Sequence, residues 1–381
     1  MEYRRDLKSS RRIVIKVGTN ILREEDGKVN LANIEKLVEQ MAVLSKGGLE
    51  VIFVTSGAIG AGMGVLGLKE RPITIALKQA AAAVGQSRLM QAYEELFAAH
   101  GIIVAQILLT GDDFNDRKRY LNSRNALTTL LDLGVIPIIN ENDTVAVEEI
   151  KLGDNDNLSA QVACLMDADL LVILTDIDGF YTVDPRHGGG ELVKTVAEIT
   201  PQMEEAAGGS GTHVGTGGMY AKLQAAKMVS GSGEYTVVAN GAVEDVILRI
   251  MEGEEIGTLF LPSGDRMSSR KRWIAFTLKP QGTLKVDDGA REALLRRGKS
   301  LLSIGITEAQ GEFEIGDAVR IVDKSFAEIA RGLASYSSDE VRKIIGLRAK
   351  DIEAVLGYKY CDEVVHRDNM VLFYDKRPSD R

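Results

Sequence analysis

Short apolar runs alternate with helical patterns along about the first 260 residues of this 381-residue chain, and this alternation is the strongest constraint on its fold. The runs include RIVIKV (12–17), EVIFVT (50–55) and VIPIIN (135–140). They are rich in β-branched residues and almost continuously apolar, as expected of parallel strands that helices cover on both faces. The sequence therefore predicts an α/β fold with a doubly wound, mainly parallel sheet sandwiched by helices.

The character of the sequence changes after Pro262. The segment that follows is polar, basic and rich in serine, which is typical of a linker. Shorter apolar runs separated by glycine turns come next, and they predict a small β-rich domain. We therefore expect an α/β domain over residues 1–262, a linker over 263–273 and the β-rich domain over 274–381.

Composition and charge exclude several classes of protein. The longest apolar stretches fall well short of the roughly 20 residues that a membrane-spanning helix needs, and the N-terminus lacks a secretory signal pattern. We therefore expect a cytoplasmic protein. Cys164 and Cys361 are too far apart for a disulfide framework or a zinc site, so we expect them to be packing residues. The formal charge is −12 over residues 1–262 and +3 over 263–381, so only the second part permits contact with nucleic acid.

Ligands of open α/β sheets bind beyond the carboxyl ends of the strands, where this sequence is rich in Gly, Ser, Thr, Asn, Asp and Lys. The glycine-rich segment TSGAIGAGMG (55–64) follows one apolar run and precedes a helix, where backbone N–H groups favour an anion. Tight packing of the strand against the helix explains the same glycines equally well. The segment is not a P-loop, because no Gly-Lys-Ser/Thr follows, and it lacks the acidic residue of a dinucleotide-binding fingerprint.

Two lysines occupy positions suited to phosphate. Lys16 lies within an apolar run and would be costly to bury without an anion nearby. Lys222 lies in GTGGMYAK (215–222), a glycine-rich turn ahead of a helix, whose backbone can hold phosphate oxygens. A surface loop with a solvated lysine is the alternative interpretation of this second segment.

Carboxylates and amides gather in NEND (140–143) and GDNDN (153–157). Metal binding by Asp143, Asp154 and Asp156 is conceivable, but their spacing is not that of an EF-hand loop. The amides favour hydrogen bonding to a small polar substrate instead. Simple turns are the alternative, and we favour that interpretation for Asp154.

The four histidines, His100, His187, His213 and His366, are scattered along the chain. No Ser/His/Asp or Cys/His grouping is evident, which argues against a hydrolase with an activated nucleophile. The remaining class of chemistry works through positioning and positive charge, as phosphoryl transfer does.

Taken in order, the motifs resemble those of the amino acid kinase family. They are KVGT, TSGAIGAG, INEND, KLGDNDNLSA, ILTDIDGFYT and GTGGMYAKLQAA. The segment after the linker resembles a PUA domain, so that the resemblance covers almost the whole chain. It implies the amino acid kinase fold followed by a small, β-rich, PUA-like domain.

The resemblance is to members of the family that transfer the γ-phosphoryl group of ATP to the side-chain carboxylate of L-glutamate, the first step of proline biosynthesis. It implies ATP and Mg²⁺ as cofactors and leaves open which residues contact the metal. The implied phosphoryl-transfer residues are Lys16, Lys222 and Asp156. The implied glutamate-binding residues are Ser56, Gly57, Asp143 and Asn155. The implied ATP-binding residues are Lys16, Thr175, Asp176, Thr216, Gly217, Gly218, Met219, Tyr220, Ala221 and Lys222.

The resemblance also implies a homo-oligomer and feedback inhibition by L-proline. We expect the polar segment Gly111–Leu121 to be a loop that senses proline. Its alternative is a plain solvated loop. RNA binding by the PUA-like domain is a further expectation that its small net charge supports only weakly.

Two groups of alternatives stay open. Aspartokinase, N-acetylglutamate kinase, carbamate kinase and UMP kinase share the fold and differ in the acceptor, but GDNDN and the PUA-like segment argue against them. The chain could instead be an RNA-binding or RNA-modifying protein that keeps the first fold as a remnant. The full set of matching site residues makes this the weaker hypothesis.

Overall fold

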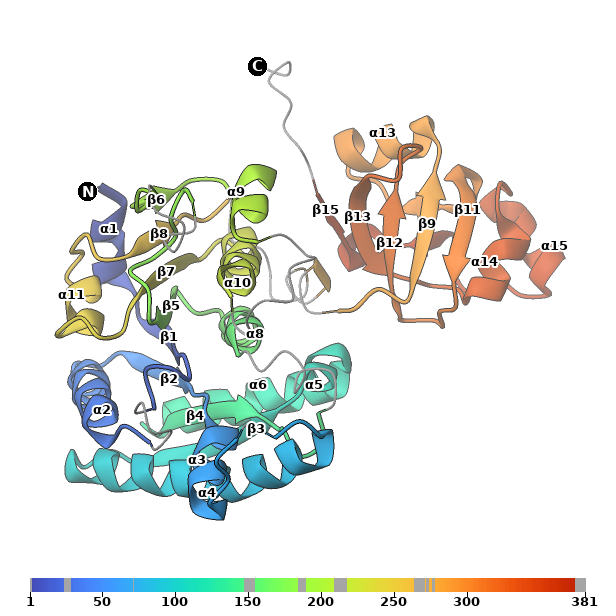
Figure 1. Ribbon diagram of the computed structural model, residues 1–381. Coiled ribbons are helices and arrows are strands. Elements are labelled where there is room, and N and C mark those ends of the chain that lie inside the picture. The colour runs from blue at the N-terminus through green and yellow to red at the C-terminus, as the bar shows by residue number, and fades with distance from the viewer. Residues whose placement is uncertain are drawn as a thin grey trace. The chain divides into compact units, whose positions relative to one another are not determined.

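The computed structural model divides the chain into two compact units, Met1–Arg266 and Met267–Arg381 (Figure 1). It describes residues 2–23, 29–70, 72–146, 155–183, 190–208, 218–263, 271, 274–275 and 278–373, apart from the side chains of residues 2, 117 and 118. The predicted linker, 263–273, lies almost wholly outside these residues. The domain boundaries 1–262 and 274–381 therefore stay predictions.

Within the described residues, the central sheet of the first unit has eight strands: β1 (Arg12–Val17), β2 (Glu50–Val54), β3 (Val104–Leu109), β4 (Ile136–Glu141), β5 (Leu170–Thr175), β6 (Thr195–Val196), β7 (Tyr235–Asn240) and β8 (Thr258–Phe260). Their order across the sheet is β3-β4-β2-β1-β5-β7-β8-β6. Neighbouring strands are parallel except β7 and β8, which are antiparallel. The predicted α/β fold with a mainly parallel sheet is confirmed.

Helices follow most of these strands and cover the sheet (Figure 1). They are α1 (Glu2–Asp6), α2 (Leu31–Lys46), α3 (Ala58–Leu66), α4 (Ile75–Ala99), α5 (Gly111–Asn115), α6 (Arg117–Asp132), α8 (Asp156–Met166), α9 (Pro201–Ala206), α10 (Met219–Gly231) and α11 (Val246–Met251), with a 3₁₀ turn at Leu7–Ser9. Helices α2, α4 and α11 share one core cluster with the sheet, while α8 and α10 pack against each other.

Alternate residues of β1 separate the two faces of the sheet. Ile13, Ile15 and Val17 are buried in the core cluster that includes α2, α4 and α11. Because successive side chains of a strand point to opposite faces, Lys16 points to the other face, where α8 and α10 lie. The pleat of one strand thus places a lysine among the helices that begin at the carboxyl edge of the sheet.

The glycine-rich segment after β2 brings two helices into close contact. A Cβ atom at Gly62 of α3 would lie 1.8 Å from the carbonyl oxygen of Ala81 in α4. A Cβ atom at Gly85 of α4 would lie 1.8 Å from the carbonyl oxygen of Ala58 in α3. Tight packing therefore explains Gly62, although it is packing of helix against helix and not of strand against helix.

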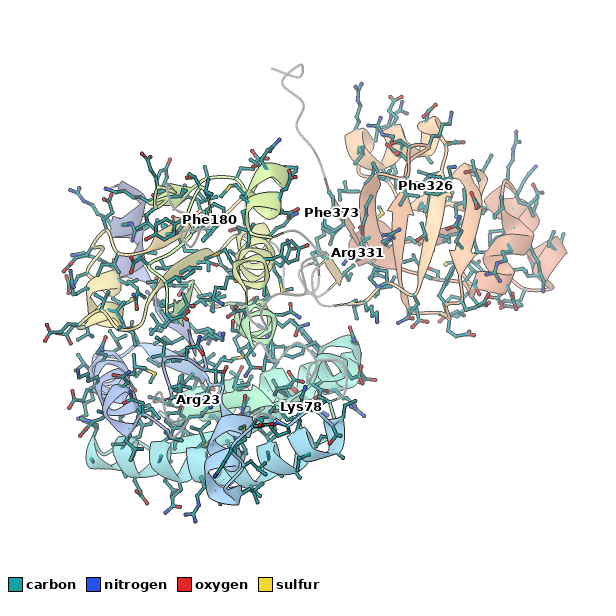
Figure 2. All side chains as sticks on the ribbon, in the orientation of Figure 1. Arg23, Lys78, Phe180, Phe326, Arg331 and Phe373 are labelled. Carbon is teal, nitrogen blue, oxygen red and sulfur yellow. The ribbon has the colours of Figure 1, made fainter. Side chains whose placement is uncertain are left out.

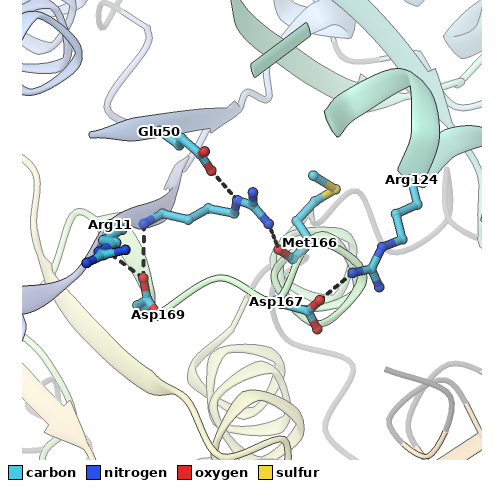
Figure 3. Close-up of polar contacts among 7 residues, drawn as sticks. Arg11, Glu50, Arg124, Met166, Asp167 and Asp169 are labelled. Atoms are coloured by element: carbon cyan, nitrogen blue, oxygen red, sulfur yellow. Dashed lines mark hydrogen bonds and ion pairs between the residues drawn. The ribbon is translucent and has the colours of Figure 1, made fainter. Parts of the chain in front are cut away.

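The amino edge of the sheet is joined by ionic contacts around Arg12 (Figure 3). The Asp169 carboxylate accepts hydrogen bonds from the backbone N–H groups of Arg11 and Arg12, at 2.8 and 3.0 Å. The Arg12 guanidinium pairs with Glu50 at 2.6 Å and donates to the carbonyl of Met166. The start of β1 is thereby held to the starts of β2 and β5 and to the end of α8.

Helix α6 is also tied to this edge, since Arg124 forms an ion pair with Asp167 just after α8 (Figure 3). Asp167 ends α8 in the left-handed conformation, with φ 55°.

Among the residues that the structure describes, no helix is long and apolar enough to cross a membrane.

The second unit has the predicted β-rich character. Its strands are β9 (Gly282–Val286), β10 (Leu301–Leu302), β11 (Ile306–Gly311), β12 (Ala318–Val322), β13 (Glu328–Leu333), β14 (Glu363–Val365) and β15 (Met370–Leu372). They form a sheet of order β11-β9-β12-β13-β15 and the pair β10-β14. The helices are α13 (Asp288–Arg297), α14 (Ser338–Ile344) and α15 (Ile352–Leu356), with 3₁₀ turns at Ser303–Gly305, Ala349–Asp351 and Arg367–Asn369.

This unit has its own apolar core, to which Leu284, Val319 and Tyr336 contribute. Arg331 of β13 contacts residues that lie before and after the sheet in the sequence. Its guanidinium donates to the carbonyl of Ala275 at 2.7 Å and lies 5.6 Å from the centre of the Phe373 ring (Figure 2). A separate core is the physical basis on which such a unit could fold by itself.

The structure corrects one prediction about the first unit. The segment Gly111–Leu121, which we expected to be a loop, is helical: it contains α5 and the start of α6. The Asp113 carboxylate accepts hydrogen bonds from the N–H and the hydroxyl of Thr110, at 2.8 and 3.0 Å, and the Asp116 carboxylate accepts from Arg119 N at 2.8 Å. These side chains cap helix starts, so the polarity that resembled a solvated loop belongs to capping residues.

Candidate active site

Two lysines and one aspartate from three elements meet at the carboxyl edge of the central sheet. The Lys16 ammonium of β1 lies 2.5 Å from Oδ1 of Asp156, the first residue of α8. The Lys222 ammonium of α10 lies 2.9 Å from Oδ2 of the same carboxylate. The Asp156 side chain has no exposed surface, and those of Lys16 and Lys222 are 3% and 6% exposed. The three groups together carry one net positive charge.

Electrostatics keep the carboxylate of this group ionised. Burial alone would raise the pKa of Asp156, but the charges and hydrogen bonds of Lys16 and Lys222 outweigh burial and lower it to about 2. The ionised form of a carboxyl group buried between two cations is the favourable one, because protonation would weaken both ion pairs at once. At neutral pH Asp156 therefore fixes the positions of both ammonium groups.

Asn155 lies directly before α8 and joins the ends of β2 and β4. Its Nδ2 donates to the carbonyl of Thr55 at 2.5 Å and to Oδ1 of Asn140 at 2.7 Å. Asn155 was a predicted site residue, whereas Asn140 and Thr55 were not. The signal for Asn140 was present in the sequence, because it opens the motif NEND at the end of a predicted strand.

Ser56 and Gly57 follow Thr55 at the same edge. Ser56 is buried, and Gly57 precedes α3 with φ 93°. This left-handed conformation suits glycine, since other residues are strained in it. The predicted pair therefore marks a turn that needs glycine and leaves the start of α3 beside the end of β1, with Thr19 Cγ2 3.8 Å from a Cβ atom built on Gly57.

Asp143 follows β4 in a turn and is partly buried. Burial raises the pKa of its carboxyl to about 6, from an ordinary value of 3.8. In the part of the chain that the structure describes, no cation pairs with it. A carboxylate whose charge is destabilised by burial gains the most from a ligand that brings a positive charge.

Thr175 ends β5 at the same edge, and Asp176 follows it. The Asp176 carboxylate accepts hydrogen bonds from Asn20 Nδ2 at 2.8 Å and from the Thr175 hydroxyl at 3.1 Å. Burial opposes its ionisation, but these hydrogen bonds and the charge of Lys222 lower its pKa. Asn20, which follows β1, was not predicted as a site residue. Asp178 has a structural contact, since it accepts a hydrogen bond from Asn240 Nδ2 at 3.0 Å.

Part of the predicted nucleotide segment lies outside the described residues. Thr216 and Gly217 of this segment are not described. Three residues elsewhere that the sequence analysis named, Asp154, His187 and His213, also lie outside the described residues. Gly218 precedes α10, and Met219, Tyr220, Ala221 and Lys222 form its first turn. Of these four residues, only Lys222 is buried.

Within the described ranges, no three His, Cys, Asp or Glu side chains form a group that could hold a metal ion. Mg²⁺ that accompanies a nucleotide is commonly bound through one or two carboxylates together with phosphate oxygens. Asp176, with its lowered pKa, is a carboxylate available for that purpose at this edge.

The family model "Amino acid kinase family" matches residues 11–240, and the model "PUA domain" matches residues 282–356. These matches cover the candidate site and most of the second unit. Relatives extend the similarity to nearly the whole chain. A "Glutamate 5-kinase" of Caldanaerobacter subterraneus subsp. tengcongensis is 57% identical over 362 residues, which is 95% of this chain and 97% of the relative. A "Glutamate 5-kinase" of Geobacter sp. is 53% identical over 367 residues, with 96% and 98% covered.

The chain therefore belongs to the amino acid kinase family and, within it, to the glutamate 5-kinases that carry a C-terminal PUA domain. Among solved structures, UMP kinase of Bacillus anthracis is similar with a TM-score of 0.46 and 18% identity, over 67% of this chain and 97% of that one. At this level the comparison says nothing about the acceptor.

Proposed function

We propose that this chain transfers the γ-phosphoryl group of ATP to the side-chain carboxylate of L-glutamate, which gives L-glutamyl 5-phosphate and ADP, the first step of proline biosynthesis. The buried group of Lys16, Asp156 and Lys222 at the carboxyl edge of the sheet is the observation that carries the proposal. The relatives named above carry the assignment of the acceptor.

The proposed reaction suits a site without a histidine. A glutamate side chain has a pKa of about 4.3, so that the nucleophile is already ionised at neutral pH and needs no general base. A bond forms between a carboxylate oxygen and the γ-phosphorus, while the bond from that phosphorus to the bridging oxygen of ADP breaks. The main barrier is repulsion between the carboxylate and the polyphosphate.

Lys16 and Lys222 would offset this repulsion in the transition state. Their ammonium groups lie within 2.9 Å of the same carboxylate, so they do not have to be brought together when the reaction begins. Asp156 would act as the positioning residue that holds them. The residual positive charge of the group would face the transferring phosphoryl, which is negative.

The acceptor would lie between Asp143 and the ends of β2 and β4. Asp143 would pair with the α-ammonium of glutamate, since its buried carboxylate gains from a cation. Asn155 Oδ1 would accept a hydrogen bond from the α-ammonium, since both Nδ2 hydrogens are already donated, and Ser56 and Gly57 would lie at the adjoining turn. ATP would lie against Thr175, Asp176 and residues 216–222, and Mg²⁺ would accompany its phosphates.

The test is an acceptor panel with the purified full-length chain. ADP release is measured with L-glutamate, L-aspartate, N-acetyl-L-glutamate, carbamate and UMP, and hydroxylamine traps an acyl phosphate as the hydroxamate. We expect ADP and hydroxamate only with L-glutamate and only with Mg²⁺ present. Turnover of another acceptor at a higher kcat/KM would reject the proposal, and no turnover with any acceptor would favour the RNA-binding alternative.

Regulation and location belong to the same proposal. We infer that the protein is a cytoplasmic homo-oligomer, in the compartment that contains its substrates ATP and glutamate. We also infer that L-proline inhibits it in competition with glutamate. The helices α5 and α6 lie after β3 at the carboxyl edge, where a second amino acid could affect glutamate binding. Asp113, which caps α5 through Thr110, is the residue we assign to this effect.

The second unit would be an interaction or regulatory domain. It contains a largely apolar cavity of about 720 Å³, beside which Lys299, His366 and Arg367 lie. Lys299 and Arg367 suit contact with an anion, although Asp287 also lines the cavity, and RNA is the anion that a PUA domain suggests. The +3 charge of residues 263–381 is a weak footprint for RNA, so we favour a regulatory role.

A further inference from the structure

Gln86 of α4 contacts the candidate glutamate site through a chain of amides. Its Oε1 accepts a hydrogen bond from Asn140 Nδ2 at 2.7 Å. Asn140 Oδ1 in turn accepts from Asn155 Nδ2 at 2.7 Å, and Asn155 Nδ2 also donates to the carbonyl of Thr55. Gln86 is therefore linked through Asn140 and Asn155 to the carbonyl at the end of β2.

Backbone groups fix the orientation of the three side-chain amides that are linked in this way, those of Asn155, Asn140 and Gln86. The Thr55 carbonyl can only accept, so Asn155 must present its Nδ2. The backbone N–H of Glu141 donates to Asn140 Oδ1 at 3.0 Å, so that Asn140 must present its Nδ2 to Gln86. Gln86 must then use its oxygen toward Asn140, and the Nε2 group is left over as a donor.

That remaining donor is one of several buried polar atoms without a hydrogen-bond partner among the described residues, and it is the one linked to the candidate glutamate site. Within the part of the chain that the structure describes, Gln86 Nε2 has no exposed surface and no hydrogen-bond partner. A buried donor without an acceptor is costly, and such groups are rare in folded proteins. An apolar side chain of similar size would avoid this cost, although it would leave Asn140 without its acceptor.

We propose that Gln86 determines specificity for the acceptor: it orients Asn155 through Asn140, and its Nε2 donates to a carboxylate oxygen of the acceptor when that substrate binds. The inference rests on the proposed function, because it concerns the same acceptor site. An anionic acceptor oxygen is the group that best satisfies a buried amide donor, since hydrogen bonds to charged oxygens are stronger than those to neutral ones.

Gln86→Glu separates the two contacts of this residue. The substituted side chain has almost the same shape and keeps an oxygen for Asn140 Nδ2, but it replaces the Nε2 donor by an oxygen that repels a carboxylate. We expect the KM for L-glutamate to rise about 10-fold or more, with the KM for ATP close to that of the unsubstituted chain, and thermal unfolding confirms that the variant is folded. A purely structural role for Gln86 predicts an unchanged KM for glutamate.

Gln91→Glu is the matched control, because it makes the same chemical change at an exposed position of the same helix. We expect it to leave the KM for glutamate within about twofold. Gln86→Met, which lacks both the donor and the acceptor, is the second variant. If Gln86→Glu does not fold, the KM of Gln86→Met decides, with a rise of about 10-fold or more expected.

The pH dependence gives an additional measurement. The carboxyl group that Gln86→Glu introduces would regain an O–H donor when it is protonated, so the ratio of the variant's glutamate KM to that of the unsubstituted chain should fall as the pH is lowered. The ratio removes the effect of Asp143, which is common to both proteins. Direct binding of L-glutamate by calorimetry is measured in parallel.

The outcomes distinguish this inference from the proposed function. If the unsubstituted chain phosphorylates glutamate and the folded Gln86 variants keep its KM, the inference alone is wrong. If the unsubstituted chain neither binds nor phosphorylates glutamate, both are wrong. A raised KM that is specific for glutamate, with a ratio that falls at low pH, supports the inference.

Discussion

The two edges of the central sheet use charged side chains for different purposes. At the amino edge, Arg12 is 22% exposed and its partner Glu50 38%, the Arg124–Asp167 pair is also partly exposed, and Asp169 accepts hydrogen bonds from backbone groups. At the carboxyl edge, Lys16, Asp156 and Lys222 are almost completely buried, and two cations share one anion. The first arrangement joins the starts of strands, while the second gathers two lysines around one carboxylate at the end of β1 and the starts of α8 and α10.

This difference explains why the charged residues of the amino edge stabilise the fold, while those of the carboxyl edge are suited to binding a ligand. Burying charged groups costs stability, and folded proteins tolerate this cost at functional sites. The same holds for the buried carboxylate of Asp143 and for the unpartnered Nε2 of Gln86 within the described residues. All three features lie at the carboxyl edge, and we find no equivalent in the contacts around Arg12.

The largest expected effect is on turnover. Lys16→Ala and Lys222→Ala should each lower kcat by about 10²-fold or more, because each removes a positive charge that acts mainly in the transition state. The KM for glutamate should change much less. Steady-state kinetics check this, with thermal unfolding to confirm that each variant is folded. Near-normal turnover in either variant would make the assigned role of that lysine wrong.

Asp143→Asn should raise the KM for glutamate by about 10-fold or more and leave the KM for ATP comparatively unaffected, because it removes the partner of the α-ammonium. In the unsubstituted chain, kcat/KM for glutamate should fall as the pH drops through about 6, where the Asp143 carboxyl becomes protonated. The variant should lack this dependence. A variant weakened only toward ATP would contradict the assignment.

Proline inhibition tests whether α5 belongs functionally to the carboxyl edge. We expect added L-proline to shift the glutamate saturation curve to higher concentrations, and Asp113→Asn to reduce this shift several-fold, since it weakens the cap of α5. The curves are measured with and without proline for both proteins. We expect substitutions of Arg117 to reduce the shift as well, whereas Asp132→Asn at the far end of α6 is the control that should leave it unchanged. An unchanged shift would leave Asp113 as a capping residue only.

Arg12→Ala should affect stability and not catalysis. It leaves Glu50 and the Met166 carbonyl without their donor, so we expect a loss of about 1–3 kcal/mol in the free energy of unfolding. Activity per folded molecule should stay within about twofold. Urea denaturation and kinetics measure the two quantities, and Arg12→Lys tests whether the guanidinium fork is required. A large fall in kcat for a folded variant would remove the distinction between the two edges.

The smallest effect is expected from removing the second unit. A chain that ends at Leu261 should still fold and phosphorylate glutamate with a kcat within a few-fold of the full chain, because all proposed site residues precede that position. Loss of the folded state or of activity would show that the second unit is integral. Residues 263–381 alone should not bind structured RNA in a salt-sensitive way, and clear binding would overturn our preference for a regulatory role.

Much of the fold could be predicted from local patterns. Nearly continuous β-branched runs such as RIVIKV became β1, and the run at 135–140 became β4 with a shift of one residue. The segment Gly111–Leu121 was predicted wrongly because charged capping residues look the same as loop residues without their partners. The sequence showed the T-x-x-D pattern of Thr110 and Asp113, which is the signal that could have identified α5.

Sequence by itself determined which residues follow each strand, and in a parallel sheet this determines which side chains reach one edge. Lys16, Asp143, Asn155 and Asp156 lie in or after such runs. The resemblance to the amino acid kinase family, and not their position alone, implied their roles and that of Lys222. Only the tertiary structure decided their partners: that one carboxylate lies between both lysines, and that Asn155, Asn140 and Gln86 form one chain of amides. These contacts depend on strand order and on the close packing of α3 against α4, which arise from long-range burial and leave no periodic signal in the sequence.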